Sequence, residues 1–359
     1  MKILLVGEFS GVHNNLRDGL KSLGHDVMLF AGGDGFKKFP ADISWDSSYS
    51  GYVGEISKVY KVIRGLQKLK EFDVVQFINP DIFMHRFGFN KYVLKQLMSN
   101  NKRSFLLVAG DHSAVWEYWK SNSDKKNIKY SWIDDLIKYD LNGQSPRWLN
   151  DSYLEWESEM LHAVNGVIPI MYEYAVPYRS FKNIRSAIPI PINVDKIIYR
   201  ENKVHNKLVI FHGLNRYGVK GTRYVEQAFN ILQKKYPNDL ELIIRGKLPY
   251  NQYLELINKT NVVIDQTTSY SLGVNGLVSM AMGKLVLGGA EPEGKEELGY
   301  KNCPAINITP DVDSIVFAIE KLLETKEKIP EMGFQSRAFV ENYHHYRKIA
   351  AAYVDVWSK

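Results

Sequence analysis

Short apolar runs alternate with helical segments along nearly the whole chain, and this alternation limits the possible folds more than any other feature. Continuous apolar runs are typical of strands that are buried on both faces of a parallel sheet. In the first half they are Lys2–Val6, Asp26–Phe30, Asp73–Ile78, Ser104–Ala109 and Gly166–Ile170. Helical patterns lie between them at Asn14–Leu23, Glu55–Lys70, Lys91–Met98 and Tyr153–Val164. The sequence therefore predicts an α/β fold.

A proline-punctuated segment, Ile188–Val194, interrupts the alternation, which then restarts. Proline fixes φ and extends the residue before it, so we expect a linker here. The later strands are predicted at Lys207–Phe211, Leu240–Ile244, Asn261–Asp265 and Leu285–Leu287. The later helices are predicted at Thr222–Lys235, Tyr250–Asn258, Val274–Met282 and Asp311–Glu324, the last with Thr309 as its N-cap. We predict two Rossmann-like β/α/β domains, residues 1–190 and 191–335, and a C-terminal helix, residues 336–359.

Two further segments have their own character. Phe334–Trp357 forms one long helical pattern rich in aromatic residues, and we expect His344 and His345 to lie on its surface. Ser113–Asp151 is aromatic and polar without a clear period. We expect it to form an elaborated loop with short helices over the cleft between the domains.

Composition excludes several classes of protein. The chain has 359 residues, a net charge of +6 and one cysteine, Cys303. A disulfide within the chain and a Cys-rich metal site are excluded. The mild positive charge suits anionic small ligands or an anionic membrane surface and is too small to argue for nucleic acid. No apolar run reaches the ~18–20 residues of a membrane span, so we expect a cytoplasmic protein.

Two strand-to-helix loops are candidates for binding an anion. Gly7–Gly11 follows the first strand, but its Gly-x-x-x-Gly spacing is not the dinucleotide fingerprint, so a ligand loop and a tight turn both remain open. Asn215–Thr222 presents Arg216 and Lys220 between glycines, which suits a diphosphate. The alternative for these two cations is solvated surface charge.

Two more loops follow predicted strands. In Asp265–Gly283, helix-start amides and two serine hydroxyls could contact a second phosphate or ligand hydroxyls; these residues are Ser271, Gly273, Val274, Asn275 and Ser279. The alternative is a turn followed by a tightly packed small-residue helix. Asp111 and His112 lie at the carboxyl end of a strand, where open α/β sheets bind ligands. They form either a catalytic pair or a capped loop.

Together these segments resemble the GT-B-fold glycosyltransferases, most closely the retaining glycosyltransferase family 4. The resemblance covers nearly the whole chain. Its motifs are Gly24–Val27 (family "GHEV"), Phe72–Val75 ("PDVVH"), Glu157 with Asn165–Ile168 ("E…ADGVI"), Pro189–Asp195 ("PNGVD"), the Asn215–Thr222 donor-diphosphate loop and Ser279–Lys284 ("EAMACGKPV").

The resemblance implies a function for each domain. The C-terminal domain would bind a nucleoside-diphosphate sugar, with Arg216 and Lys220 on the diphosphate. The N-terminal domain would bind the acceptor, with Asp111 and His112 near the transferred sugar and Gly11 at an acceptor or phosphate loop. The implied reaction is hexosyl transfer to a saccharide or lipid-linked saccharide, without metal or cofactor, in bacterial surface polysaccharide or glycolipid synthesis. Peripheral association with an anionic membrane is also implied, as is a C-terminal helix that crosses back to the N-terminal domain.

The sequence departs from the family at one motif. Ser271 and Ser279 stand where the family has Glu-x7-Glu, and a serine cannot make the bidentate, charge-assisted contact of a carboxylate. A donor-binding partner subunit without turnover is therefore one alternative. A nucleotide-sugar epimerase is another, although it would need acid and base groups at the cleft, where Asp111 and His112 are the obvious pair.

Overall fold

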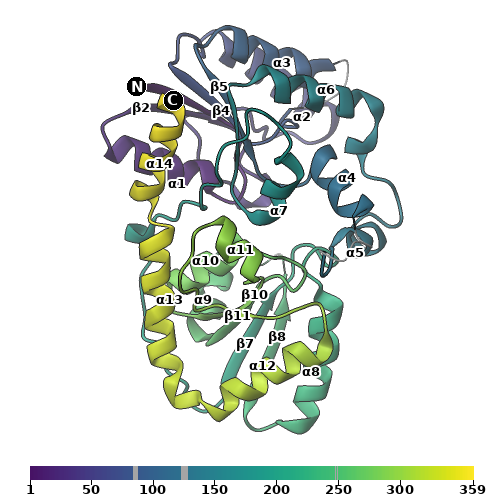
Figure 1. The fold of residues 1–359 in the computed structure, drawn as a ribbon, viewed down its shortest axis with the longest axis vertical. Helices are drawn as coiled ribbons and strands as arrows, with labels where there is room; N and C mark the ends of the chain where they lie inside the picture. The colour runs from purple at the N-terminus through teal and green to yellow at the C-terminus, as the bar shows by residue number, and fades with distance from the viewer. Residues whose placement is uncertain (84–87, 123–127, 247, 249) are drawn as a thin grey trace.

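Two parallel sheets form the centres of two domains (Figure 1). The computed structural model describes residues 1–83, 88–122, 128–246, 248 and 250–359. The N-terminal sheet has the strand order β3-β2-β1-β4-β5-β6 and the C-terminal sheet the order β11-β10-β9-β7-β8. The predicted α/β fold with two parallel-sheet domains is confirmed.

The N-terminal sheet agrees closely with the sequence pattern. Its strands are β1 (Lys2–Val6), β2 (Asp26–Ala31), β3 (Ile43–Ser44), β4 (Val74–Phe77), β5 (Ser104–Val108) and β6 (Gly166–Pro169). Its helices are α1 (Val12–Ser22), α2 (Gly51–Leu66), α3 (Phe89–Ser99), α4 (Ser113–Ser121), α5 (Ile133–Asp135), α6 (Asp151–Ala163) and α7 (Tyr172–Ala175). β1 lies between β2 and β4, and its residues from Ile3 to Val6 are completely buried, as its uninterrupted apolar pattern predicts.

The C-terminal sheet is built in the same way. Its strands are β7 (Leu208–Gly213), β8 (Leu240–Arg245), β9 (Val262–Ile264), β10 (Leu285–Gly288) and β11 (Ile306–Asn307). The helices of this half are α8 (Thr222–Lys235), α9 (Tyr250–Lys259), α10 (Val274–Ala281), α11 (Pro292–Glu297), α12 (Val312–Glu324) and α13 (Ile329–Tyr343). The prediction of Thr309 as the N-cap of α12 is wrong, because the Asp311 carboxylate accepts the Ser314 N–H and caps the helix.

The strand orders locate the ligand-binding edge of each sheet. In open α/β sheets the crevice forms where the strand order reverses, outside the carboxyl ends of the strands. In the C-terminal sheet this point lies between β7 and β9, and in the N-terminal sheet between β1 and β4. The loops that follow these strands are therefore the first places to look for a site.

The C-terminal segment is two helices rather than the single helix that its pattern predicts. α13 ends at Tyr343 and α14 (Tyr346–Ser358) begins after a break at His344 and His345. At the break, Ile192 of the interdomain linker donates its N–H to the His344 carbonyl and accepts the Tyr346 N–H. The prediction that His344 lies on the surface is also wrong: its ring is buried between the Ile190 carbonyl and the Tyr300 hydroxyl, and burial lowers its pKa to about 4.

The crossing of the last helix to the N-terminal domain is confirmed. Figure 1 shows α13 along the C-terminal domain and α14 beside α1, so that both chain ends lie at the N-terminal domain. Trp357 is fully buried and donates its indole N–H to Gln76 of β4 over 3.2 Å. Gly19 of α1 lies so close to α14 that a Cβ atom there would be 2.4 Å from the Tyr346 carbonyl oxygen. The two domains are therefore tied together by the end of the chain as well as by the linker.

Candidate functional site

The loop that follows β7 carries the two cations expected to hold a diphosphate. It runs from the end of β7 to α8, and Gly221, with φ of +62°, is the N-cap of that helix. Glycine adopts this left-handed conformation without strain. Arg216 and Lys220 thus lie at the carboxyl edge of the sheet, beside the point where the strand order reverses.

Arg216 reaches across the domain boundary. Its guanidinium Nη2 lies 2.5 Å from Oδ2 of Asp111, which follows β5 in the N-terminal domain. Burial opposes the charge of Arg216, yet the carboxylates of Asp111 and Asp140 raise its pKa. Two residues that the sequence predicts separately, one for each domain, are therefore in direct contact.

Lys220 also has a carboxylate partner. Its Nζ lies 3.3 Å from Oδ1 of Asp265, a buried residue directly after β9. The other oxygen of Asp265 accepts the Gly273 N–H at the start of α10 over 3.2 Å. Asp265 therefore joins the cationic loop to the helix start that was expected to face a second phosphate.

A third carboxylate approaches the same loop from the N-terminal domain. α5 and the π-helical turn after it, Leu136–Asp140, extend to the C-terminal domain (Figure 1). Oδ2 of Asp140 accepts the N–H groups of Gly218 and Val219, each over 3.0 Å. The backbone of α5 also lies close to this loop. Gly218 leaves room for it, since a Cβ atom there would be 2.1 Å from the Asp135 carbonyl oxygen.

The segment expected over the cleft bridges the two domains; its residues 123–127 lie outside the described part of the chain. Lys129 forms ion pairs with Glu291 and Glu293, and Asp135 forms one with Arg223. The rings of Trp119 and Tyr270 are also in contact, with centroids 5.3 Å apart. These contacts hold Asp140 against the cationic loop.

The remaining predicted donor residues lie in and before α10, and several of their polar groups already have protein partners. The Ser271 hydroxyl accepts the Tyr172 N–H over 3.2 Å, and the buried Ser279 hydroxyl donates to the Asn275 carbonyl over 2.8 Å. The Asn275 side-chain oxygen accepts the Tyr253 hydroxyl. Val274 is the first residue of α10. The hydroxyls of both serines therefore already form hydrogen bonds within the protein.

The backbone N–H of Gly11 also has a hydrogen-bond partner within the protein. The Glu8 carboxylate, in the same loop, accepts the N–H groups of Gly11 and Asn14 over 2.9 and 2.8 Å. A carboxylate of the chain thus caps the start of α1, where a ligand phosphate was one expectation. Burial raises the pKa of Glu8 despite these hydrogen bonds. The Gly11 N–H therefore has a carboxylate partner within its own loop, and the role of Gly11 in an acceptor or phosphate loop stays a prediction.

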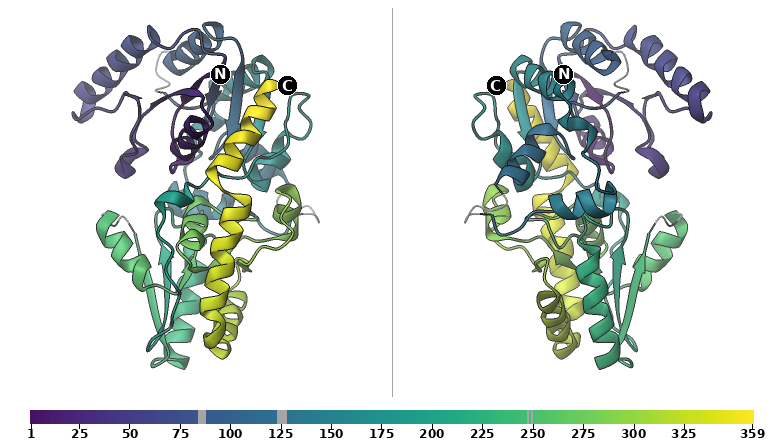
Figure 2. Two further views of the ribbon diagram at one scale, coloured as in Figure 1. Left: turned by 90° about the vertical axis from the view of Figure 1, so that its left-hand side faces the viewer. Right: turned by 90° about the vertical axis from the view of Figure 1, so that its right-hand side faces the viewer.

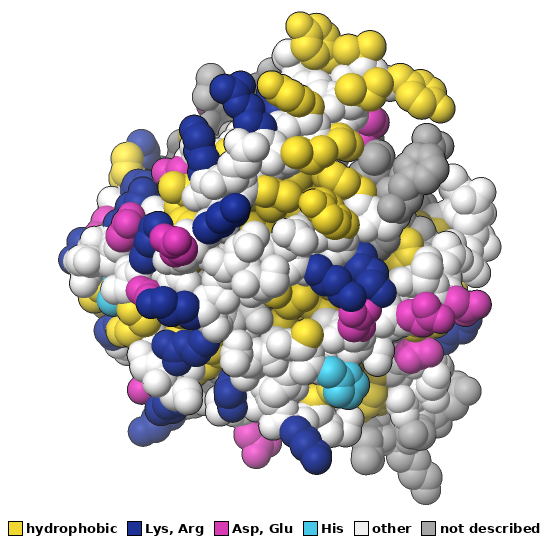
Figure 3. Space-filling view, turned by 90° about the horizontal axis from the view of Figure 1, so that it is seen from above, with side chains coloured by type: hydrophobic (Ala, Val, Ile, Leu, Met, Phe, Trp, Pro, Cys, Tyr) yellow, Lys and Arg dark blue, Asp and Glu magenta, His cyan; other side chains and the backbone are white. Residues whose placement is uncertain are grey.

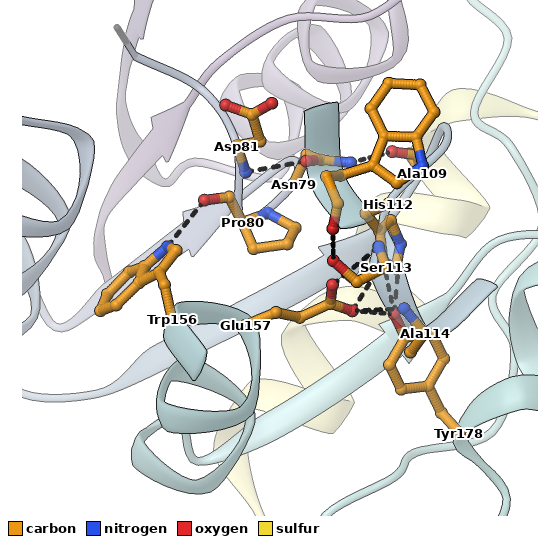
Figure 4. A network of polar contacts seen from close by, with 11 residues as sticks. Asn79, Pro80, Asp81, Ala109, His112, Ser113, Ala114, Trp156, Glu157 and Tyr178 are labelled. Carbon is orange, nitrogen blue, oxygen red and sulfur yellow. Dashed lines mark hydrogen bonds and ion pairs between the residues drawn. The ribbon is translucent and has the colours of Figure 1, made fainter. Parts of the chain in front are cut away.

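His112 belongs to a buried network inside the N-terminal domain (Figure 4). Its Nδ1 lies 2.8 Å from Glu157 Oε1, and the Tyr178 hydroxyl lies within 3.2 Å of both ring nitrogens. The other oxygen of Glu157 accepts the Ser113 N–H over 2.8 Å. Burial alone would raise the pKa of Glu157, but His112 and these hydrogen bonds lower it to about 2. Glu157 thus binds both the His112 ring and the N–H groups at the start of α4, whereas Asp111 pairs with Arg216 of the other domain.

Two further residues at the boundary between the domains could not be predicted from the sequence. Glu173 of α7 is buried and accepts the N–H of Ser271 over 2.8 Å and hydrogen bonds from Ser269 and Tyr270. Tyr174 follows it, and burial and the charges of Asp111 and Glu173 raise its pKa. An acid followed by a tyrosine in a short helix has no distinctive spacing. Only the fold reveals that Glu173 binds the segment before α10 and that Tyr174 lies near Asp111 and Arg216.

Among the residues that the structure describes, no group of three or more His, Cys, Asp or Glu side chains could hold a metal ion. Among the same residues, no helix has the length and the apolar character needed to cross a bilayer.

Comparison with known proteins identifies the fold. No protein-family model and no curated protein matches the sequence. Among solved structures, sucrose-phosphate synthase from Thermosynechococcus elongatus is similar over all of this chain and 98% of its own, with a TM-score of 0.64 at 14% identity. HepE of Anabaena, solved with UDP and glucose, is similar over both full chains, with a TM-score of 0.61 at 12% identity. A Rickettsia africae glycosyltransferase has a TM-score of 0.55 at 12% identity, covering 99% of this chain and 97% of its own. The chain has the GT-B fold.

Proposed function

We propose that this GT-B-fold chain is a glycosyltransferase that moves a hexose or a similar sugar from a nucleoside diphosphate to a hydroxyl acceptor. The donor would bind at the carboxyl edge of the C-terminal sheet and the acceptor on the N-terminal domain. Arg216 and Lys220 would hold the diphosphate in place of a metal ion, and the transfer would proceed with retention.

One observation carries the proposal. The loop after β7 directs two cations and two backbone N–H groups to the carboxyl edge of the sheet, and three carboxylates partner them: Asp111, Asp265 and Asp140. Carboxylate and phosphate oxygens take the same hydrogen bonds from arginine, lysine and amide groups. A loop that gathers so many anionic partners has the chemistry to bind a diphosphate.

The same groups suit the chemical step. When the bond between the sugar and the diphosphate breaks, the leaving group gains negative charge. Fixed cations that contact its oxygens stabilise that charge more in the transition state than in the ground state. As Arg216 turns from Asp111 to the diphosphate, the Asp111 carboxylate becomes available to a hydroxyl of the sugar or the acceptor.

A structurally similar protein that was solved with its ligands guides the choice of the donor to test. HepE of Anabaena was solved with UDP and also with UDP-glucose, at 12% identity to this chain. We therefore propose a uridine diphosphate sugar as the first donor to test. A saccharide or lipid-linked saccharide is the proposed acceptor, in the assembly of bacterial surface polysaccharide or glycolipid at the membrane.

A partner subunit that binds the donor without turnover is the second candidate. The hydroxyls of Ser271 and Ser279 are both committed to bonds within the protein, and a carboxylate is missing from both positions. An epimerase has less support, because both ring nitrogens of His112 already have protein partners and Asp111 alone faces the boundary.

Acceptor-dependent release of nucleoside diphosphate separates these candidates. A thermal-shift panel of nucleotide sugars first identifies the donor, since a ligand that binds only the native state raises its stability. Release of diphosphate is then measured with and without candidate glycan and glycolipid acceptors. Release that increases with acceptor supports a transferase. Donor binding with no acceptor-dependent release over the whole acceptor panel supports the partner subunit.

A further inference from the structure

Strand β8 lies at one edge of the C-terminal sheet, and no strand of the described residues lies beyond it. The N-terminal sheet has the complete strand order of a doubly wound domain, with β3 outside β2. The C-terminal sheet follows the same order without a counterpart of β3, because the chain passes from β8 through α9 to β9. Figure 2 shows the strand that leads into α9 along the outer side of this domain. One side of β8 is therefore unpaired.

The other three sheet edges are short or covered. β3 and β11 have two residues each. On the outer side of β6, Val167 donates its N–H to the Asn183 carbonyl over 3.0 Å and accepts the Arg185 N–H over 2.8 Å. Short strands and covering segments are the usual protection of a sheet edge, as are lysine and proline. β8 has six residues, LELIIR, and includes neither lysine nor proline. It therefore lacks these protections.

Two residues of β8 direct their backbone groups away from β7. The Leu214 N–H donates to the Arg245 carbonyl over 2.8 Å, so Arg245 turns its carbonyl toward β7. Because these directions alternate along a strand, the N–H and C=O groups of Leu242 and Ile244 point outward. In the part of the chain that the structure describes, nothing binds them there. The side chains of Leu242 and Ile244 are half-buried and line an open groove beside Phe229 of α8.

We propose that β8 pairs antiparallel with β8 of a second copy of this chain, about a two-fold axis at Ile243. In this register Leu242 of each copy lies opposite Ile244 of the other, and each such pair exchanges two backbone hydrogen bonds. The two five-stranded sheets become one continuous sheet. The two-fold axis closes the assembly as a dimer, in which neither β8 strand has a free edge.

Charge favours a second copy in this register. Glu241 and Arg245 are exposed on one face of β8, and neither side chain has an ion-pair partner among the described residues. With Ile243 on the axis, Glu241 of each copy lies opposite Arg245 of the other. Both pairs are of the non-hydrogen-bonded kind, in which facing side chains are closest. The strand is therefore complementary to itself in charge as well as in its backbone groups.

Helix α2 offers a rival surface for pairing. Its side chains Tyr52, Val53 and Ile56 are 78%, 61% and 67% exposed. Seen from above, hydrophobic side chains gather at one edge of the N-terminal domain (Figure 3). Residues 51–70 contain five cations and one acid, so two copies of this segment would repel each other. The β8 edge has no such charge imbalance, and Ile56→Asp provides the control that separates the two surfaces.

Sedimentation velocity of the full chain over a range of concentrations tests the proposal without a donor, so the result does not depend on sugar transfer. We expect a dimer. Glu241→Arg and Arg245→Glu each place like charges opposite each other, and each should raise the Kd of the dimer about tenfold. The combined exchange restores opposite charges and should return the Kd to the wild-type value. Ile56→Asp should leave the Kd unchanged, and thermal unfolding verifies that every variant is folded.

Oxidative cross-linking tests the register. In a Cys303→Ser background, Ile243→Cys should form a disulfide-linked dimer, because facing Cα atoms of a non-hydrogen-bonded pair lie about 4.5 Å apart. Ile231→Cys is the control, since Ile231 is 45% exposed on α8 and should not cross-link. If Ile243→Cys does not fold, the charge series decides alone. The proposal is overturned if the wild type is monomeric at every concentration, if Ile56→Asp dissociates the dimer, if the combined charge exchange fails to restore it, or if both cysteine variants cross-link equally.

Discussion

Arg216 of the C-terminal domain and Asp111 of the N-terminal domain form an ion pair across the domain boundary, with 2.5 Å between Nη2 and Oδ2. The two residues are 105 positions apart in the sequence. In the proposed function both lie at the transferred sugar, the first on the diphosphate and the second facing a hydroxyl. The ion pair and the donor then compete for the same guanidinium.

This competition predicts opposite effects of one substitution on binding and on turnover. Asp111→Asn removes the carboxylate that competes for Arg216, so nucleoside diphosphate should bind more tightly, by about two- to tenfold. Turnover should fall, because an amide cannot accept a proton. Calorimetric titration and acceptor-dependent release measure the two quantities. Weaker binding together with unchanged turnover would show that Asp111 serves only the domain contact.

Activity should survive an excess of chelator. Arg216 and Lys220 already supply two positive charges at the proposed diphosphate position. The measurement is acceptor-dependent release after dialysis against EDTA, with added Mg²⁺ or Mn²⁺ as the comparison. A strict requirement for either ion would contradict the two-cation account, because the metal would then carry the charge of the leaving group.

The Glu157 network predicts a pH-dependent contribution to stability. The pKa of Glu157 in the folded protein is about 2, below its ordinary value of 4.5, so its contribution is present above pH 4.5 and disappears as the pH falls toward 2. Glu157→Gln should lower the free energy of unfolding by about 2–3 kcal/mol at pH 7. Denaturant unfolding should show this difference shrinking between pH 4.5 and 3.

The neighbouring Glu155 provides the control for that series. Glu155 is exposed on the same helix, so Glu155→Gln should leave the free energy of unfolding almost unchanged at every pH. The free energies of unfolding of Glu157→Gln and the wild type could instead differ by the same amount from pH 7 to pH 3. That result would show that the charge of the Glu157 carboxylate does not contribute to stability.

Removing the end of α14 should weaken the N-terminal domain. Trp357 and Tyr353 are fully buried there, and loss of a buried tryptophan alone costs about 3–5 kcal/mol. We expect deletion of Ala350–Lys359 to expose the N-terminal domain to limited proteolysis, while nucleotide binding by the C-terminal half largely persists. If the truncated protein instead resists proteolysis between the domains as the wild type does, but has lost its affinity for nucleotide, the helix serves the donor site.

Local pattern was enough to predict most elements. The strand Lys2–Val6 and the helix Thr222–Lys235 have the same limits in the structure as in the prediction. Gly7 follows the strand, and Pro237 forces Tyr236 out of the helical conformation. The break at His344 was not predictable. It coincides with two backbone hydrogen bonds to Ile192, which is distant in sequence, so no local pattern marks it.

Part of the site was also predictable from the sequence, because several of its residues directly follow predicted strands. Arg216, Lys220 and Asp111 lie directly after strands, and the carboxyl ends of parallel strands share one edge. Asp140 and Glu173 come from segments without a period, so only tertiary structure brings them to that edge. The pattern of Glu55–Lys70 likewise predicts a helix with an apolar stripe, but not that Ile56, Tyr60 and Ile63 of that stripe are exposed to solvent.

In the proposed function Arg216 and Lys220 hold a diphosphate. The most direct measurement is the binding of nucleoside diphosphates and their matching nucleosides to the wild type, Arg216→Ala, Lys220→Ala and the exposed-lysine control Lys234→Ala. We expect one diphosphate to bind the wild type and the control far more tightly than its nucleoside does. Each clamp variant should lose about 1.5–3 kcal/mol of that binding. Equal binding of diphosphate and nucleoside, or full affinity in both clamp variants, would contradict it.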